Sequence, residues 1–400
     1  MKTIVNTIIL KGYDLTPIKS NILIDDGKIV EISNEVFEGE IIDGTGAMVC
    51  PSFLNAHTHI GDSIIKDYGD GKSIEELVKP PNGLKHLSLS NSSDDEIISS
   101  MRNSLWDMIK TGTTHFIDYR EGGLKGIKLL KKAAFDIPIN PIILGRDPIF
   151  HDKERSEDEI RKITAKLLKN CDGIGLSGFN EVSKEVCEIV TKECIKRDKI
   201  PSIHVGEYLE LQKKSLKETG KTEIERAVNL NFKLLIHSTY PIGNDLSLIS
   251  ENNKLIALCP RSNGALNLGI PPIRNFIEQK INMLIGTDNI MLNSPNLMRE
   301  MEYTLKIMRA YYKKYIKPKD ILKMATVNGC NKSDDNLDKK SLNFYSTVNK
   351  TVIEEDNDAQ LFITKLISKN PYLNIINRVE TDNIIAIINK DKFLYLNNRK

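Results

Sequence analysis

The stretch PSFLNAHTHI, residues 51–60, contains an apolar run that ends in two histidines separated by a single residue. The apolar run predicts a buried β-strand, and successive side chains of a strand point to opposite faces. His57 and His59 therefore lie on the same face and can hold one cation between them. The chain has only seven histidines, so this pair indicates a site, although a lone His-x-His pair can also be accidental.

Short apolar segments alternate with amphipathic helices beyond this strand. We expect eight strands, over residues 48–57, 112–119, 140–146, 173–179, 200–205, 232–238, 254–260 and 281–288. One helix between them begins at Ser93, which has Glu96 in capping-box spacing, and carries its apolar residues on one face. Eight such units predict an α/β fold with a (β/α)8 TIM-like barrel.

The two ends of the chain have a different character from the barrel segment. Residues 1–48 are rich in Ile and Val and contain a hairpin signal, DDG, at residues 25–27. Residues 340–400 contain similar short β segments. Such segments often close into one sheet around an inserted domain. We therefore expect residues 1–48 and 340–400 to form a small composite β-sandwich domain, and residues 49–339 to form the barrel.

The composition is that of an ordinary globular protein, with 40% hydrophobic and 28% charged residues and a formal net charge of +2. This near balance of charge argues against nucleic acid as a partner, and no stretch reaches the roughly 20 apolar residues of a membrane span. The start lacks the apolar core of a signal peptide, and the six cysteines show no framework spacing. These features predict a cytoplasmic protein that binds neither nucleic acid nor a membrane.

Other side chains that can bind a metal also lie at the ends of predicted strands. His204 ends the fifth strand, His237 the sixth and Asp288 the eighth. In barrels of this type the active site lies at the C-terminal ends of the strands, so we expect these side chains to converge with the first two histidines. Imidazoles and a carboxylate suit Zn²⁺ or Fe²⁺. The expected metal ligands are His57, His59, His204 and Asp288.

Five short motifs also carry a resemblance to a known family: PSFLNAHTH, HVGE, LLIHS, CPRSN and GTDN. In this order they resemble the amidohydrolase superfamily, and within it the cytosine deaminase and triazine hydrolase (aminohydrolase) branch. The resemblance implies the same four metal ligands. It also implies that His237 orients the attacking water and that Glu207 protonates a ring nitrogen of the substrate. Asp288, beside that water, is then the expected general base and acid.

The activity that follows is metal-dependent hydrolytic removal of an amino group, as ammonia, from a pyrimidine, purine, nucleoside or pterin. The alternative is hydrolysis of a cyclic amide at the same metal site, as in dihydroorotase and imidazolonepropionase relatives. A third interpretation, a barrel that serves as a scaffold without catalysis, is disfavoured because every metal ligand is present. The resemblance also allows a homo-oligomer, since its members are commonly dimers or larger.

The expected cofactor is one divalent metal ion, with Zn²⁺ preferred over Fe²⁺ and Mn²⁺. Members of the superfamily with two metals bridge them through a carboxylated lysine on the fourth strand. Residues 173–181 contain no lysine, and Glu181 is expected to open the next helix, so a single ion is predicted.

Four further side chains are candidate substrate contacts: Arg120, Arg146, Arg261 and His86. A guanidinium group at the barrel mouth can bind a carboxylate or phosphate through two hydrogen bonds. The alternative for Arg120 and Arg146 is an ion pair with the acid that follows each in the sequence. Residues 61–92, which include His86, are expected to form a loop over the pocket.

Overall fold

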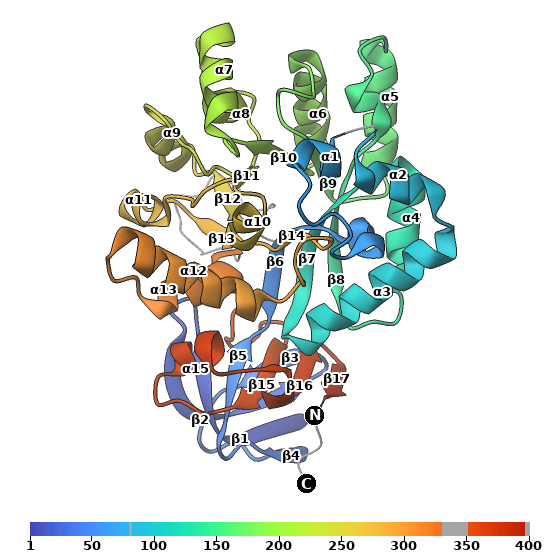
Figure 1. Cartoon of the computed structure of the whole chain (residues 1–400). Coiled ribbons are helices and arrows are strands. Elements are labelled where there is room, and N and C mark those ends of the chain that lie inside the picture. The colour runs from blue at the N-terminus through green and yellow to red at the C-terminus, as the bar shows by residue number, and fades with distance from the viewer. Residues whose placement is uncertain (80–81, 330–350, 397–400) are drawn as a thin grey trace.

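The structure is a computed structural model that describes residues 1–79, 82–329 and 351–396. It has two parts, a parallel barrel surrounded by helices and a smaller sheet that lies below the barrel in Figure 1. The first and last described strands, β1 (Lys2–Lys11) and β17 (Lys392–Tyr395), both belong to the smaller sheet.

The barrel sheet is parallel, in the order β13-β12-β11-β10-β9-β8-β7-β6-β14. Its strands are β6 (Phe53–His59), β7 (Thr113–Arg120), β8 (Asn140–Gly145), β9 (Gly173–Leu176), β10 (Ile200–Val205), β11 (Leu234–His237), β12 (Leu255–Leu258), β13 (Met283–Ile285) and β14 (Asp288–Asn289). The predicted TIM-like barrel is confirmed, with the eighth strand divided into β13 and β14. Because β13 pairs with β12 and β14 pairs with β6, the two parts of this strand join the edges of the sheet.

Helices cover the outside of the barrel, as Figure 1 shows. The described helices of four residues or more are η1 (Ile60–Ile65), α1 (Ile74–Val78), α2 (Leu84–Asn91), α3 (Asp94–Lys110), α4 (Gly123–Ala134), η2 (Pro148–His151), α5 (Glu157–Leu168), α6 (Lys184–Lys196), α7 (Leu209–Thr219), α8 (Glu223–Asn229), α9 (Asp245–Glu251), α10 (Pro260–Ala265), α11 (Ile273–Glu278), α12 (Leu297–Tyr312), α13 (Pro318–Ala325) and α15 (Pro371–Asn377). Among the described residues, none of these helices combines the length and apolar character needed to cross a membrane.

The capping box predicted for α3 is present. The Glu96 amide donates to the Ser93 hydroxyl at 3.3 Å, and the Ser93 amide donates to the Glu96 carboxylate at 2.8 Å. These two bonds satisfy backbone groups that a helix start otherwise leaves without partners. The apolar face of α3, including Met101 and Leu105, is fully buried.

Two local predictions are wrong. Residues 61–92 are not a simple loop, because they contain η1, α1 and α2. Helix α1 begins with a capping box of its own, formed by Ser73 and Glu76, whose Ser-x-x-Glu spacing the sequence prediction overlooked. Glu181 does not open a helix either, since Ser183 caps α6 and Glu181 precedes it.

The smaller sheet combines strands from both ends of the chain, in the order β17-β16-β15-β5-β1-β2-β3, with β4 also paired to β1. Its other strands are β2 (Thr16–Asp25), β3 (Lys28–Glu31), β4 (Glu40–Asp43), β5 (Ala47–Pro51), β15 (Gln360–Lys365) and β16 (Ile384–Asn389). The sheet folds back on itself, because Lys28 of β3 forms a bridge with Asp358, just before β15. Buried residues such as Ile22, Val49 and Leu361 fill the interior, so the predicted β-sandwich is confirmed.

The domain boundaries stay predictions. The first, after residue 48, falls within β5, which pairs with β1 and β15 of the smaller sheet. The second, after residue 339, lies outside the described residues.

A buried asparagine joins the two edges of the barrel sheet. The Asn55 side-chain oxygen accepts from the Thr287 amide at 3.0 Å, and its side-chain nitrogen donates to the Thr287 hydroxyl at 2.8 Å. Thr287 lies between β13 and β14, so both hydrogen bonds attach the break in the eighth strand to β6. The next residue, Asp288, then pairs with Thr58 of β6.

Replacing Asn55 by alanine is expected to destabilise the fold by about 2–4 kcal/mol, because two buried polar groups lose their partner. Urea unfolding followed by circular dichroism measures this loss. The control is Asn34→Ala, at an exposed position, which is expected to change the free energy of unfolding by less than about 0.5 kcal/mol. Equal unfolding midpoints for the two variants would contradict the role of Asn55.

Candidate active site

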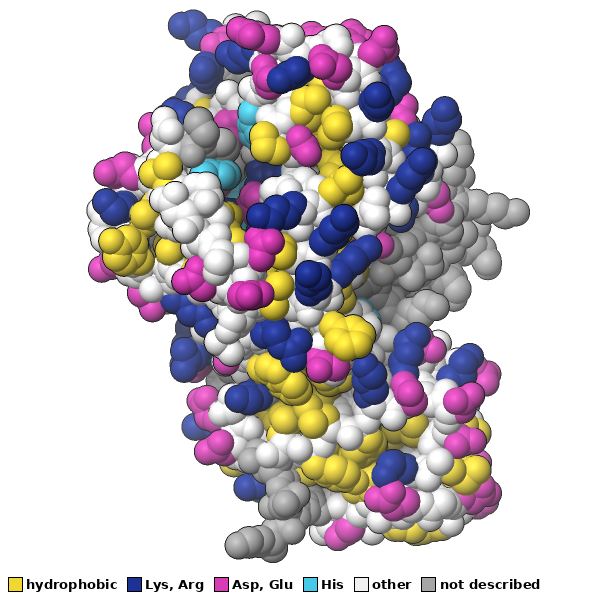
Figure 2. Space-filling model, turned by 90° about the vertical axis from the view of Figure 1, so that its right-hand side faces the viewer, with side chains coloured by type: hydrophobic (Ala, Val, Ile, Leu, Met, Phe, Trp, Pro, Cys, Tyr) yellow, Lys and Arg dark blue, Asp and Glu magenta, His cyan; other side chains and the backbone are white. Residues whose placement is uncertain are grey.

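A cavity of about 370 Å³ lies at the C-terminal ends of the barrel strands. On the face shown in Figure 2, histidine side chains are visible inside a hollow in the upper, barrel part of the molecule. The residues that line the cavity include His59, Lys79, Lys85, His86, Arg146, Ser177, Glu181, His204, Glu207, Tyr208, His237, Asp288 and Asn289. A cavity of this size accommodates a small organic molecule.

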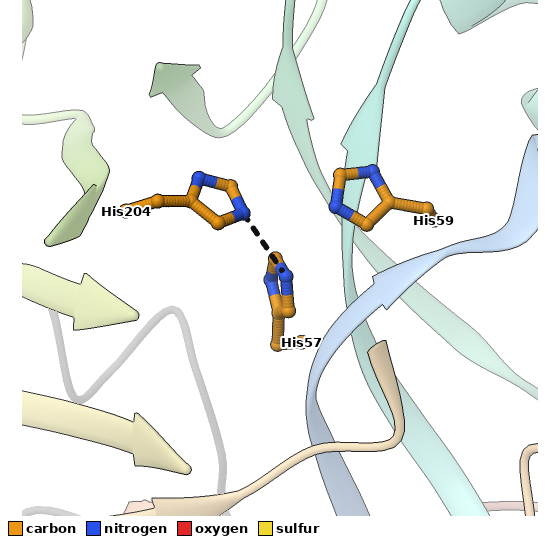
Figure 3. Close-up of side chains that lie close together, drawn as sticks. All are labelled: His57, His59 and His204. Atoms are coloured by element: carbon orange, nitrogen blue, oxygen red, sulfur yellow. Dashed lines mark hydrogen bonds between the residues drawn. The ribbon is translucent and has the colours of Figure 1, made fainter. Parts of the chain in front are cut away.

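Three imidazoles face one another beside this cavity, and two of them, His59 and His204, line it. His57 and His59 come from β6 and His204 comes from β10, on the opposite side of the barrel (Figure 3). The Nε2 atoms of His57 and His204 are 3.3 Å apart, and the nearest nitrogens of all three rings lie within 4.8 Å of one another. The period of two in β6 thus brings its two histidines to one point, as predicted.

Hydrogen bonds on the far side of two rings fix their tautomers. His204 Nδ1 lies 2.8 Å from the Leu176 carbonyl oxygen, and His59 Nδ1 lies 3.0 Å from Glu121 Oε1. Both oxygens can only accept, so each Nδ1 carries the ring proton. The Nε2 lone pairs of both rings are therefore directed into the space that they share with His57.

Burial keeps these rings neutral. It lowers the pKa of His59 to about 3, with a further contribution from the charge of Lys85. Burial and the neighbouring His57 also hold the pKa of His204 well below its usual range. A neutral imidazole is the form that binds a metal ion, so no proton has to leave these rings at neutral pH.

Asp288 provides a carboxylate beside the imidazoles. Its Oδ1 is 3.2 Å from His57 Nε2, and its Oδ2 accepts a hydrogen bond of 2.7 Å from the Ser262 hydroxyl. Burial alone would raise the pKa of Asp288, but the interaction with His57, above all their hydrogen bond, holds it well below its usual range. Asp288 also has a left-handed backbone, with φ of 60°, a strained conformation that clusters at functional sites.

Glu207 and His237 form a second acid–imidazole pair in the cavity wall. Glu207 Oε1 lies 3.5 Å from His237 Nε2, and burial raises the pKa of the Glu207 carboxyl. The loop that carries Glu207 is held by the Gly206 amide, which donates to Glu223 at 3.0 Å. His237 shares the strained left-handed backbone of Asp288, with φ of 68°.

The converging donors fit a divalent cation. Two overlapping groups have ligand atoms close enough for one ion: His57 with His59 and His204, and His57 with His237 and Asp288. Neutral imidazoles together with a charged carboxylate are the donors that Zn²⁺ and related ions prefer. The structure therefore brings together all four side chains that the sequence predicted as ligands.

Two of the four predicted substrate contacts line the cavity. Arg146 is one of them. Its Nη1 lies 3.5 Å from Glu121 Oε1, and its Nη2 donates a hydrogen bond to the Ser177 hydroxyl. His86 of α2 also lines it, and its Nε2 is 3.0 Å from the Val78 carbonyl oxygen. Both side chains can therefore reach a bound molecule.

The other two arginines do not line the cavity. Arg120 is buried, with its guanidinium 3.1 Å from Glu121 and 3.8 Å from Asp118, which is the internal pairing considered as the alternative. Arg261 lies outside the cavity lining and is 3.7 Å from Glu300. The expectation that both lie at the cavity is wrong: Arg120 is turned to Glu121 and Asp118, and Arg261 belongs to α10 rather than to a strand end.

Two residues of the site, Lys85 and Glu121, were not predicted as site residues from the sequence. Lys85 of α2 is only 2% exposed and places Nζ 2.5 Å from Glu121 Oε1. Burial raises the pKa of Glu121, yet Lys85 and His59 together hold it well below its usual range. Glu121 directly follows β7 and could have been found by the strand-end rule that identified the histidines. Lys85 carries no such signal.

The fold and the site together define a TIM-barrel hydrolase with a histidine-rich centre for a metal ion. Comparison with known proteins agrees with this class. The sequence model of the amidohydrolase family matches residues 48–332. This chain therefore belongs to the amidohydrolase family, and it is a hydrolase that acts on carbon–nitrogen bonds other than peptide bonds.

Three relatives illustrate the similarity. A protein of Methanothermobacter thermautotrophicus, whose name assigns it provisionally to the aminohydrolases, is 47% identical over 395 residues, covering 98% of this chain and 99% of its own length. The 5-methylthioadenosine/S-adenosylhomocysteine deaminase of Pyrococcus horikoshii is 26% identical, covering 81% and 80%. The zinc complex of atrazine chlorohydrolase from Arthrobacter aurescens has a TM-score of 0.82 at 17% identity, covering 99% and 95%.

Zinc added to the metal-stripped protein is expected to raise its thermal stability, because an ion that binds only the folded state stabilises it. The gain is about 2.7 kcal/mol at a free concentration one hundred times the Kd. Thermal unfolding with and without Zn²⁺ measures it, and His57→Asn combined with His59→Asn is expected to abolish most of the shift.

The control is His115→Gln. His115 is buried outside the cluster, where it is bonded to Thr114 and Asn140, so this variant is expected to keep the zinc-induced shift. An equal shift in the parent, the double variant and the control would show that zinc binds elsewhere.

Proposed function

We propose that this chain is a metal-dependent hydrolytic deaminase of an amino-substituted heterocycle, such as a pyrimidine, purine, nucleoside or pterin. The observation that carries the proposal is the position of Glu207, which lines the same cavity as His204 and Asp288. Burial raises the pKa of Glu207, so this side chain keeps a proton at a pH where an ordinary glutamate has lost it. Protonation of a ring nitrogen requires such an acid.

The proposed cofactor is a single divalent ion, with Zn²⁺ preferred, held by His57, His59, His204 and Asp288. When bound, the ion would act as a Lewis acid and lower the pKa of a coordinated water toward neutrality. Strand β9, the fourth of the barrel, reads Gly173–Leu176 and contains no lysine that could bridge a second ion. The complex of atrazine chlorohydrolase with zinc supports this choice of metal.

The chain's own residues would then move two protons. Asp288, whose pKa lies well below its usual range, accepts the proton of the attacking water as its oxygen bonds to the amino-bearing carbon. Glu207 donates its proton to the adjacent ring nitrogen, which makes that carbon more electrophilic. Asp288 next delivers its proton to the amino group, the carbon–nitrogen bond breaks, and ammonia leaves. The hydroxyl group that remains on the carbon gives its proton to the Glu207 carboxylate, which leaves a carbonyl and restores both carboxyl groups to their starting states.

His237 has a supporting role in this scheme. Its Nε2 faces Glu207 at 3.5 Å, and its ring centroid lies 5.5 Å from that of His204. A ring in this position can orient the water that attacks and stabilise negative charge on its oxygen as the intermediate forms.

Two relatives direct the choice of substrates. The Pyrococcus horikoshii relative is named as a deaminase of 5-methylthioadenosine and S-adenosylhomocysteine, and the Methanothermobacter thermautotrophicus relative is named with the aminohydrolases. Purine nucleosides therefore come first among the compounds to test, followed by free purines, pyrimidines and pterins.

Purified protein of known metal content is expected to release ammonia from at least one compound of this panel. Glu207→Gln and Asp288→Asn are each expected to lower kcat by about 10²- to 10⁴-fold, because each removes a proton-transfer step. Coupled detection of ammonia, together with the ultraviolet spectrum of the heterocycle, measures the reaction.

The control is Glu218→Gln, at an exposed position on α7, which is expected to keep the rate of the parent. No ammonia from any compound, with metal bound, would contradict deamination and favour the cyclic amide alternative. Full activity in Glu207→Gln would show that Glu207 is not the acid that protonates the ring nitrogen.

A further inference from the structure

Glu121 contacts His59 on the side of the ring that faces away from the other histidines of the candidate metal site. It follows β7 directly, and its side chain is 10% exposed. Its Oε1 lies 3.0 Å from His59 Nδ1, while the Nε2 of the same ring faces Asp288 Oδ1 at 3.6 Å. One side of the His59 ring therefore meets a carboxylate, and the other side meets the centre of the cluster.

This contact determines how His59 can bind a cation. A charged carboxylate only accepts hydrogen bonds, so the neutral ring places its proton on Nδ1 and its lone pair on Nε2. His204 reaches the same state through the backbone carbonyl of Leu176. For His57, no partner of Nδ1 is found among the described residues. Glu121 is thus the side chain that orients one of the three imidazoles.

Glu121 is itself held in place by three cations from different parts of the chain. Lys85 of α2 places Nζ 2.5 Å from Oε1, the oxygen that faces His59. Arg120 of β7 places Nη2 3.1 Å from Oε2, and Arg146, directly after β8, places Nη1 3.5 Å from Oε1. A carboxylate bound from several directions has little rotational freedom, so the direction in which it accepts from His59 is fixed.

We propose that Glu121 is a positioning residue of the metal centre, which holds His59 with Nε2 aimed at the cation, and that Lys85 fixes Glu121 for this task. The inference rests on the metal site of the proposed function. The competing explanation is that Glu121 only neutralises the surrounding cations, and this makes a different prediction for metal affinity. A carboxylate behind a ligating histidine typically contributes about 10- to 100-fold to metal affinity.

The test is the affinity of the metal-stripped full chain for Zn²⁺, measured by competition with a chromophoric chelator. Glu121→Met keeps the length of the side chain but removes the acceptor, and Glu121→Gln keeps an acceptor oxygen without the charge. Glu181→Gln is the control, because it removes the same charge from the wall of the same cavity. Circular dichroism verifies the fold of each variant.

We expect Glu121→Met to weaken zinc binding by about 10- to 100-fold, Glu121→Gln to weaken it less, and Glu181→Gln to stay within about threefold of the parent. If Glu121→Met does not fold, the double variant Glu121→Met with Lys85→Met, which removes opposite charges together, replaces it. Parental zinc affinity in Glu121→Met, or an equal loss in Glu181→Gln, would overturn the proposal.

The same measurements separate this inference from the proposed function. A parent chain that binds zinc but releases no ammonia would refute the deaminase, and the comparison of zinc affinities would still decide the role of Glu121. A parent chain that binds no zinc would overturn both.

Discussion

The closure of the barrel between β6 and β14 is the constraint on which the site depends. Strand β6 carries His57 and His59, and β14 begins with Asp288, which pairs with Thr58 between them. The Asn55 side chain both donates to and accepts from Thr287, which lies in the break of the eighth strand. These two hydrogen bonds stabilise the pairing of the next residue, Asp288, with β6. The strained backbone of Asp288, with φ of 60°, is tolerated because its neighbours on both strands are fixed.

The surroundings of Asp288 and Glu207 push the pKa values of these two carboxyl groups in opposite directions. Asp288 lies next to His57 and keeps its pKa well below the usual range, whereas Glu207 has its pKa raised by burial in the same cavity. Two carboxyl groups whose environments push their pKa values apart can accept and donate protons at one pH. The neutral imidazoles contribute lone pairs, and Glu121 and the Leu176 carbonyl hold two of them in the required tautomer.

The sequence predicted the parts of the site that belong to regular strands. All eight barrel strands and the convergence of His57, His204 and Asp288 follow from strand periodicity and from the rule that strand ends meet at one face. Short side chains at the end of a strand have few directions to take, so their positions can be inferred.

Longer side chains and connections were harder to predict. Arg120 ends β7 but pairs with Glu121 and Asp118, and the sequence left this pairing and a substrate contact both open because a long side chain can turn in several directions. Lys85 comes from a connection that was predicted as a loop but contains helices, and its burial depends on where α2 packs. Side chains from such connections, which form much of the cavity wall, depend on tertiary packing and could not be assigned from the sequence.

The central claim is that three imidazoles and one carboxylate from the strand ends hold a single ion. Zinc K-edge X-ray absorption of the zinc-loaded protein tests it most directly. The account predicts only nitrogen and oxygen ligands, at about 2.0–2.2 Å, with the multiple scattering of imidazole rings. A sulfur ligand at about 2.3 Å, or the absence of imidazole scattering, would contradict it.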